Sequence, residues 1–152
     1  MAVTTGSERF GLWVVTVSWQ GDTVYRVHLG RTGEEGPVHP LVHRYLTGQE
    51  VDFSGIASPA DELGGVSGAI YRAVRGVGYG ETATYGEIAA RVGTSPRAVG
   101  QAMARNPTPL VIPCHRIVSR NGLGGFSSPL EIKRDLLAME RTVLRGKGRK
   151  GG

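Results

Sequence analysis

Two short helices with clear boundaries, between residues 84 and 105, place the strongest constraint on the fold of this chain. The first begins with a capping box formed by Thr84 and Glu87 and stops at a glycine. The second has Ser95 at its cap position and a proline in its first turn, and it ends before an Asn-Pro pair. Helix, glycine-containing turn and helix together predict a helix-turn-helix, an arrangement common in DNA-binding domains.

The outer face of the second helix carries little bulk. Val99 and Met103 are expected to turn inward, which leaves one long side chain and several small ones outside, namely Arg97, Ala98, Gly100, Gln101 and Ala104. Such a face lets a DNA backbone or groove approach closely, and it offers few side chains that could read base edges. The alternative is that the small residues pack loosely against another part of the protein.

The single cysteine, Cys114, follows an apolar run and a proline, and His115 and Arg116 follow it directly. A lone cysteine is commonly a small buried hydrophobe. A core position, however, does not need adjacent basic side chains, which cost free energy when they are buried without partners. A nucleophilic cysteine does benefit from them, because imidazole or guanidinium favours the reactive thiolate.

These segments resemble the O6-alkylguanine-DNA alkyltransferase family. The matching motifs are Pro113-Cys114-His115-Arg116, Thr84-Tyr85-Gly86-Glu87-Ile88-Ala89, Arg97-Ala98-Val99-Gly100, Asn106-Pro107, Asn121-Gly122-Leu123-Gly124-Gly125-Phe126-Ser127 and Lys133-Arg134-Asp135-Leu136-Leu137-Ala138-Met139-Glu140. In order and spacing they cover about residues 67–140, whereas the first sixty residues resemble the family only loosely. The resemblance implies irreversible, single-turnover transfer of the alkyl group from O6-alkylguanine in DNA, with O4-alkylthymine as a further candidate substrate.

The resemblance also implies roles for five catalytic residues. Cys114 is the alkyl acceptor, His115 the general base through a water molecule, and Glu140 the residue that orients the imidazole. Asn106 is the hinge between the DNA-binding helix and the cysteine segment, and Tyr85 donates to N3 of the leaving guanine.

For the DNA, the resemblance implies minor-groove binding without sequence specificity, and Arg97 takes the place of the flipped-out base. The expected DNA-contacting residues are Arg97, Ala98, Gly100, Gln101, Thr84 and Ser95. The expected substrate pocket consists of Met103, Pro109, Ile117, Phe126 and Ser127. The backbone carbonyls of Cys114 and Ile117 are expected to read the base edge. Phe126 stands where many relatives have tyrosine, and the glycine-rich stretch before it is expected to form a pocket wall.

Charge is distributed unevenly along the chain. The net charge is +5, but residues 1–66 carry four basic and eight acidic groups, whereas 67–140 carry nine basic and five acidic ones. Residues 141–152 add five basic groups and no acid. A basic patch can be a solvated face only; next to a helix-turn-helix pattern it favours nucleic acid as the partner.

The sequence predicts an α+β protein with a small N-terminal α/β supporting domain and a mainly helical, winged-helix-like C-terminal domain. The predicted units are a supporting domain, a linker, a DNA-binding and alkyl-transfer domain and a disordered basic tail, at 1–56, 57–66, 67–140 and 141–152. Within them we expect strands at 12–18, 23–29 and 51–53, and helices at 40–47, 67–77 and 132–139.

Several classes of protein are disfavoured. No stretch has the 18 or so apolar residues of a membrane span, and the first nine residues lack a secretory signal. One cysteine cannot form an internal disulfide, and a chain without an export signal is expected to stay in the reducing cytoplasm. We also expect a monomer. His28, His39 and His43 match no compact zinc pattern, so we expect surface histidines, no metal and no cofactor.

Two rival functions remain. An alkyltransferase-like damage sensor would flip the base without accepting the alkyl group, but such proteins lack the cysteine that stands here at 114. A helix-turn-helix regulator would treat Cys114 as core, but it would be expected to place base-reading side chains on the outer face of 96–105.

Overall fold

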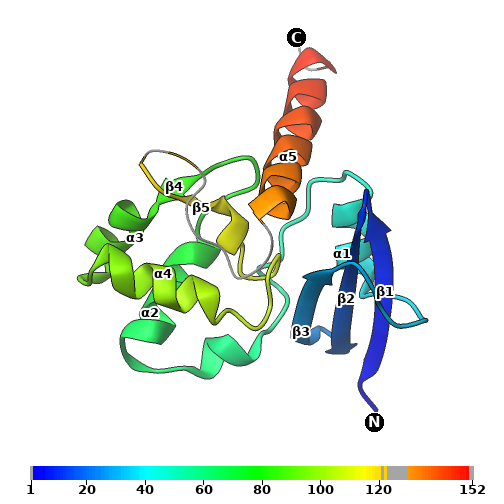
Figure 1. Ribbon diagram of the computed structural model, residues 1–152, viewed down its shortest axis with the longest axis horizontal. Coiled ribbons are helices and arrows are strands. Elements are labelled where there is room, and N and C mark those ends of the chain that lie inside the picture. The colour runs from blue at the N-terminus through cyan, green and yellow to red at the C-terminus, as the bar shows by residue number, and fades with distance from the viewer. Residues whose placement is uncertain (1, 121, 123–129, 151–152) are drawn as a thin grey trace.

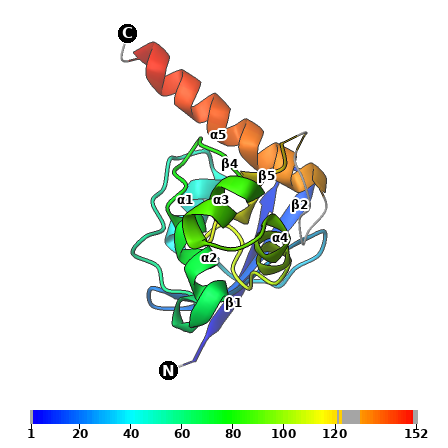
Figure 2. The same ribbon diagram turned by 90° about the vertical axis from the view of Figure 1, so that its left-hand side faces the viewer.

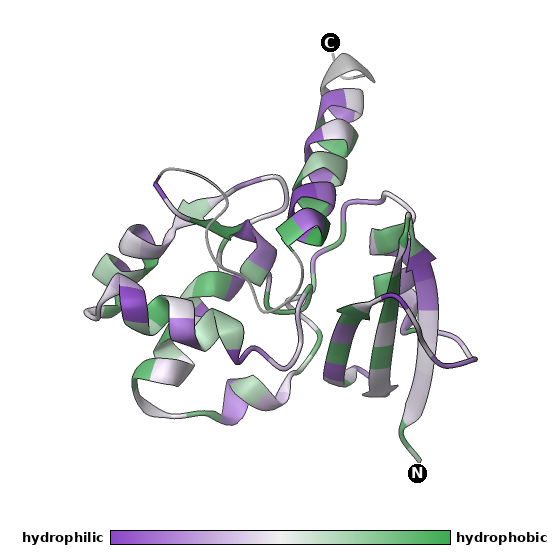
Figure 3. Ribbon diagram, in the orientation of Figure 1, coloured by the Kyte–Doolittle hydropathy of each residue, from purple (hydrophilic) through white to green (hydrophobic). Residues whose placement is uncertain are grey.

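The computed structural model describes residues 2–120, 122 and 130–150, without the side chains of 148–150. The N-terminal half is a three-stranded antiparallel sheet in the order β1 (Thr4–Phe10), β2 (Trp13–Gln20), β3 (Thr23–Gly30), with α1 (Pro40–Leu46) packed against it (Figure 1). The predicted hairpin is confirmed as β2 and β3, whose register pairs Val17 with Val27. β3 alternates between hydrophobic and hydrophilic residues, as a strand with one face on a core should (Figure 3).

Three details of this half differ from the sequence-based expectation. β1 was not predicted, because its sequence is mostly polar and its pairing with β2 is a tertiary effect. Residues 51–53 form no strand; Val51 and Phe53 instead lie in the hydrophobic core. His39 is not at the surface: it is buried, and its Nδ1 accepts from the backbone N–H of Leu41 at 3.1 Å, so that it caps α1.

The predicted linker contains a short 3-10 helix, η1 (Pro59–Glu62). Ser58 caps it, and the hydroxyl of Ser58 lies 2.7 Å from that of Thr108. The stretch before η1 is hydrogen-bonded to the sheet, since the N–H of Val24 in β3 donates to the carbonyl of Ala57 at 2.9 Å. These contacts attach the linker to both halves of the molecule.

The second half contains α2 (Gly65–Arg75), β4 (Ala83–Thr84), α3 (Tyr85–Val92), α4 (Pro96–Ala104), η2 (Cys114–Arg116) and β5 (Ile117–Val118). The helix-turn-helix is confirmed. The capping box of Thr84 and Glu87 is formed, Gly93 ends α3 in the left-handed region at φ 84°, and Ser95 caps α4. α2 begins at Gly65 rather than Ser67 and has no side-chain cap. β4 and β5 pair in parallel, whereas a wing would be an antiparallel hairpin; residues 123–129 lie outside the described part of the chain.

The last helix, α5 (Leu130–Lys150), is much longer than the predicted 132–139. The prediction of a disordered tail is therefore wrong for residues 141–150. The tail contains Val143 and Leu144, and Leu144 packs so closely on Gly80 that a Cβ on this glycine would lie 2.0 Å from Leu144 Cδ1. Beyond these contacts α5 extends away from the body of the molecule (Figures 1 and 2).

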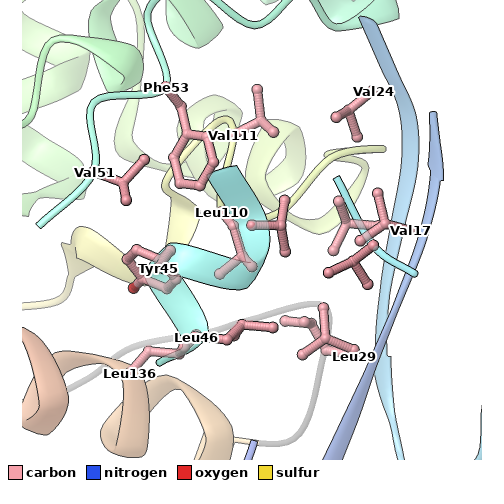
Figure 4. Packing of buried hydrophobic residues seen from close by; sticks show 14 of the residues in the cluster. Val17, Val24, Leu29, Tyr45, Leu46, Val51, Phe53, Leu110, Val111 and Leu136 are labelled. Atoms are coloured by element: carbon pink, nitrogen blue, oxygen red, sulfur yellow. The ribbon is translucent and has the colours of Figure 1, made fainter. Parts of the chain in front are cut away.

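Two hydrophobic cores meet at the segment that carries the cysteine. Leu110 and Val111 belong to the core of the N-terminal sheet, together with Ile132 and Leu136 of α5. Ile112, Cys114 and Ile117 belong to the core of the helical half. Figure 4 shows Leu110 and Val111 among the residues of the first core. Among the described residues, no helix is both long and apolar enough to cross a membrane.

Candidate functional site

The loop that leads into the cysteine is held by Asn106. Its Nδ2 donates to the carbonyl of Ile112 at 2.8 Å, and its Oδ1 accepts from the N–H of Thr108 at 3.0 Å. Asn106 thus joins the end of α4 to the residues just before Cys114. Within this loop Leu110 has a left-handed φ of 78° although it has a side chain, which costs about 1–2 kcal/mol. Burial of its side chain in the N-terminal core holds it there.

Cys114 lies at the first position of η2 and is 1% exposed. Burial raises the pKa of its thiol to about 11, because a thiolate loses hydration in the core. The Asn106 side chain, the charge of Lys133 and nearby backbone amides oppose this effect. The thiol is therefore protonated at neutral pH, and it must lose its proton to become a nucleophile.

Beside it, His115 and Glu140 form a buried pair. Nε2 of His115 lies 2.6 Å from Oε2 of Glu140, and both side chains are almost fully buried. Burial lowers the pKa of His115, although the carboxylate of Glu140 acts in the opposite direction. Nδ1 of His115 is buried and has no hydrogen-bond partner among the described residues.

Glu140 accepts hydrogen bonds on both oxygens. Oε1 accepts from Arg116 Nε at 3.0 Å and from the N–H of Gly80 at 2.8 Å. Oε2 accepts from Tyr45 at 2.6 Å in addition to His115. Burial alone would raise the pKa of this carboxyl, but the hydrogen bonds from His115 and Arg116 and the positive charge of Arg116 outweigh it and hold the pKa at about 2.

Tyr85 and Lys133 also lie near the thiol. Burial and the nearby Cys114 raise the pKa of Tyr85. Lys133 is fully buried, its Nζ lies 5.8 Å from the ring centre of Tyr85, and it donates to the carbonyl of Ile117 at 2.5 Å. Burial lowers the pKa of Lys133 to about 8. The Ile117 carbonyl, expected to read a base edge, already accepts from this lysine.

The remaining predicted residues fall into three groups. Met103, Pro109 and Ile117 are buried, and Met103 and Ile117 share a core with Cys114. On α4 and at its cap, Arg97, Gln101 and Ser95 are exposed, Ala98 and Gly100 are half-buried, and the hydroxyls of Ser95 and Thr84 cap their helices. Phe126, Ser127 and the glycine-rich stretch before them lie outside the described residues, apart from Gly122.

Sequence reasoning gave no role to Tyr45 and Lys133, and it expected the Arg116 guanidinium to favour the thiolate, whereas this group binds Glu140. Arg116 carried a signal, since it is part of the Pro-Cys-His-Arg motif. Tyr45 lay among the apolar positions of a predicted helix and therefore looked like core. Lys133 carried no signal of burial, because lysine is rarely buried.

Comparison with known proteins shows which family this chain resembles. A family model described as 6-O-methylguanine DNA methyltransferase, DNA binding domain, matches residues 66–142. A methylated-DNA–protein-cysteine methyltransferase of Metallosphaera sedula is 46% identical over 101 residues, which are 66% of this chain and 64% of that protein. One from Methanopyrus kandleri is 41% identical over 99 residues, which are 65% of this chain and 75% of that protein. The match covers only 42% of the relative from Methanocaldococcus vulcanius.

Solved structures with the same fold cover nearly the whole chain. The O6-methylguanine methyltransferase of Mycobacterium tuberculosis has a TM-score of 0.72 and 25% identity, and covers 92% of this chain and 93% of its own. A structure of Mycobacterium tuberculosis OGT in complex with DNA has a TM-score of 0.74 at 24% identity, covering 91% and 93%. Because the family model matches half of the chain and the Methanopyrus relative is similar over three quarters of its own length, this chain belongs to the methylated-DNA–protein-cysteine methyltransferase family.

Proposed function

We propose that this protein repairs DNA by moving the alkyl group of O6-alkylguanine onto Sγ of its own Cys114. The observation that carries the proposal is the single thiol of the chain, buried beside a His115–Glu140 pair whose outer imidazole nitrogen, Nδ1, is left without a partner among the described residues. A core cysteine needs no such neighbours. Family membership supports the same reading.

The chemistry is a displacement at carbon. Sγ forms a bond to the alkyl carbon while the bond between that carbon and O6 breaks, and the electron pair leaves with the guanine. The proton of the thiol passes to His115 Nδ1, directly or through a water molecule, because His115 is neutral and Nε2 is already bound to Glu140. The Tyr85 hydroxyl, kept protonated by its raised pKa, donates to N3 of the leaving base.

The thiol lies in a core, so the base must leave the DNA stack to reach it. α4 binds the minor groove through Arg97, Ala98, Gly100 and Gln101, and Arg97 fills the space of the extruded base. Thr84 and Ser95, at the helix caps, contact the DNA backbone. Few side chains on this face can read base edges, so binding is independent of sequence.

Each molecule reacts once, because the product is a thioether, which is not hydrolysed at neutral pH. Met103, Pro109, Ile117, Phe126 and Ser127 form the alkyl and base pocket. The protein acts as a monomer, and it works in the reducing cytoplasm, where the thiol persists.

Intact mass spectrometry after incubation with duplex DNA containing O6-methylguanine tests the proposal. Wild-type protein should gain one CH2 unit at Cys114, whereas Cys114→Ser protein should gain nothing while binding the DNA almost as well. No gain in mass by wild-type protein that binds the DNA would instead support a damage sensor or a regulator.

A further inference from the structure

A side chain from the N-terminal half of the molecule contacts both members of the buried His115–Glu140 pair. Tyr45, in α1, is fully buried, and its ring centre lies 5.8 Å from that of Phe53, 6.0 Å from Tyr79 and 6.2 Å from His115. Its hydroxyl lies 2.6 Å from Oε2 of Glu140 and 3.2 Å from Nε2 of His115. Figure 4 shows Tyr45 at the edge of the N-terminal core, near Leu46 and Leu136.

The directions of these hydrogen bonds follow from the carboxylate. Glu140 is ionised and can only accept, so the hydroxyl hydrogen of Tyr45 points to Oε2. The same argument places a hydrogen on Nε2 of His115, which also donates to Oε2. A Tyr45 oxygen that donates to Glu140 faces His115 with lone pairs only, and this too favours a hydrogen on Nε2.

The position of the imidazole hydrogen matters for the transfer. With the hydrogen on Nε2, neutral His115 has an acceptor at Nδ1, the nitrogen without a partner among the described residues. With the hydrogen on Nδ1, the same ring could not accept a proton there. The burial that raises the pKa of Tyr45 also keeps its hydroxyl protonated, so it remains a donor throughout the working pH range.

We propose that Tyr45 is a positioning residue for alkyl transfer: its hydroxyl holds Oε2 of Glu140 in place, and together the two groups fix the Nε2–H tautomer of His115. This inference rests on the proposed function and deepens it. It gives the N-terminal half a part in the chemistry, because Tyr45 of α1 contacts His115 and Glu140, which come 70 and 95 positions later in the chain.

Tyr45→Phe tests this, because it removes the hydroxyl and keeps the buried ring. Tyr79→Phe is a matched control: Tyr79 packs on the same ring, and its hydroxyl is buried without a partner among the described residues. The rate of transfer from free O6-benzylguanine should fall about tenfold or more in Tyr45→Phe, part of the 10²–10⁴-fold that positioned proton transfer supplies. Tyr79→Phe should react at the wild-type rate.

Nitrogen-15 spectra of labelled histidine give a readout that loss of packing alone would not move. Wild-type His115 should show the Nε2–H tautomer, and Tyr45→Phe should show a mixture with Nδ1–H. Melting curves establish that each variant is folded at the assay temperature. A wild-type protein with the hydrogen on Nδ1 would overturn the inference without any variant, and so would a Tyr45→Phe protein with unchanged rate and tautomer. A wild-type protein that transfers no benzyl group would instead overturn the proposed function, while its tautomer remains measurable.

Discussion

At the scale of single residues, the side chain that depends most on its surroundings is Glu140. A buried carboxylate is tolerated only when hydrogen bonds and opposite charge replace its hydration. Here Tyr45, His115, Arg116 and the N–H of Gly80 all donate to it. Removing the charge leaves these donors facing a group that cannot accept from all of them.

We therefore expect Glu140→Gln to lose about 3–5 kcal/mol of stability at neutral pH, the usual cost of breaking a buried pair. The pH dependence has a defined sign. The pKa of Glu140 lies at about 2 in the folded protein, below its ordinary 4.5. Its contribution is therefore fully present above pH 4.5 and is lost as the pH falls from there through about 2.

Urea unfolding between pH 2 and pH 7 should show that the free energy of unfolding falls more steeply on acidification in wild type than in Glu140→Gln. Glu87→Gln is the control, because Glu87 also has a lowered pKa but sits in an exposed capping box. Parallel plots of unfolding free energy against pH for wild type and Glu140→Gln would contradict a stabilising role of the Glu140 carboxylate.

At the scale of elements, the parts that the sequence predicts well are those with local signals. The ends of α3 and α4 follow from Thr84, Gly93 and Ser95, whose side chains and backbone act within one turn of the helix. The length of α5 could not be predicted in this way, because Leu144 is ordered by contact with Gly80, more than sixty residues earlier. β1 could not be predicted for the same reason, since its polar sequence becomes a strand only through pairing with β2.

The site divides in a similar way. The motif and the resemblance point to Cys114, His115 and Glu140, and the structure places His115 and Glu140 in contact, next to the buried cysteine. Tyr45 and Lys133 belong to this site only because α1 and α5 pack around the cysteine loop, residues 106–114. The spacing of residues along the chain does not predict these tertiary contacts.

For α4, the prediction concerns Arg97, the long exposed side chain of its outer face. Arg97→Ala should slow repair of alkylated duplex DNA by a factor that corresponds to about 1–3 kcal/mol, the scale of a lost charge-assisted contact. Reaction with free O6-benzylguanine should hardly change, since the free base needs no extrusion. Arg44→Ala, which removes the same charge from an exposed position of α1, should leave both rates near wild type. Equal losses on both substrates would assign Arg97 to folding or chemistry instead.

At the scale of the whole molecule, the cysteine loop connects the two cores. Leu110 and Val111 anchor it in the sheet half, Ile112 and Cys114 in the helical half, and Asn106 ties it to the end of α4. The left-handed backbone of Leu110 is held in place by this packing. A change in volume at Cys114 must therefore be accommodated by both halves and by α4.

The proposed alkylation would make that change. It converts a buried thiol, packed in one core with Met103 and Ile117, into a bulkier thioether. Adding a methylene to a well-packed core typically costs about 1–3 kcal/mol, which for a chain of this size lowers the melting temperature by about 2–4 °C per kcal/mol. We expect methylated protein to melt below the free protein and benzylated protein lower still. Amide hydrogen exchange should rise in α4, which would help release the repaired DNA. Cys114→Ser protein exposed to the same substrates should keep its melting temperature. Equal or higher melting temperatures for the alkylated forms would show that the loop absorbs the added group without strain.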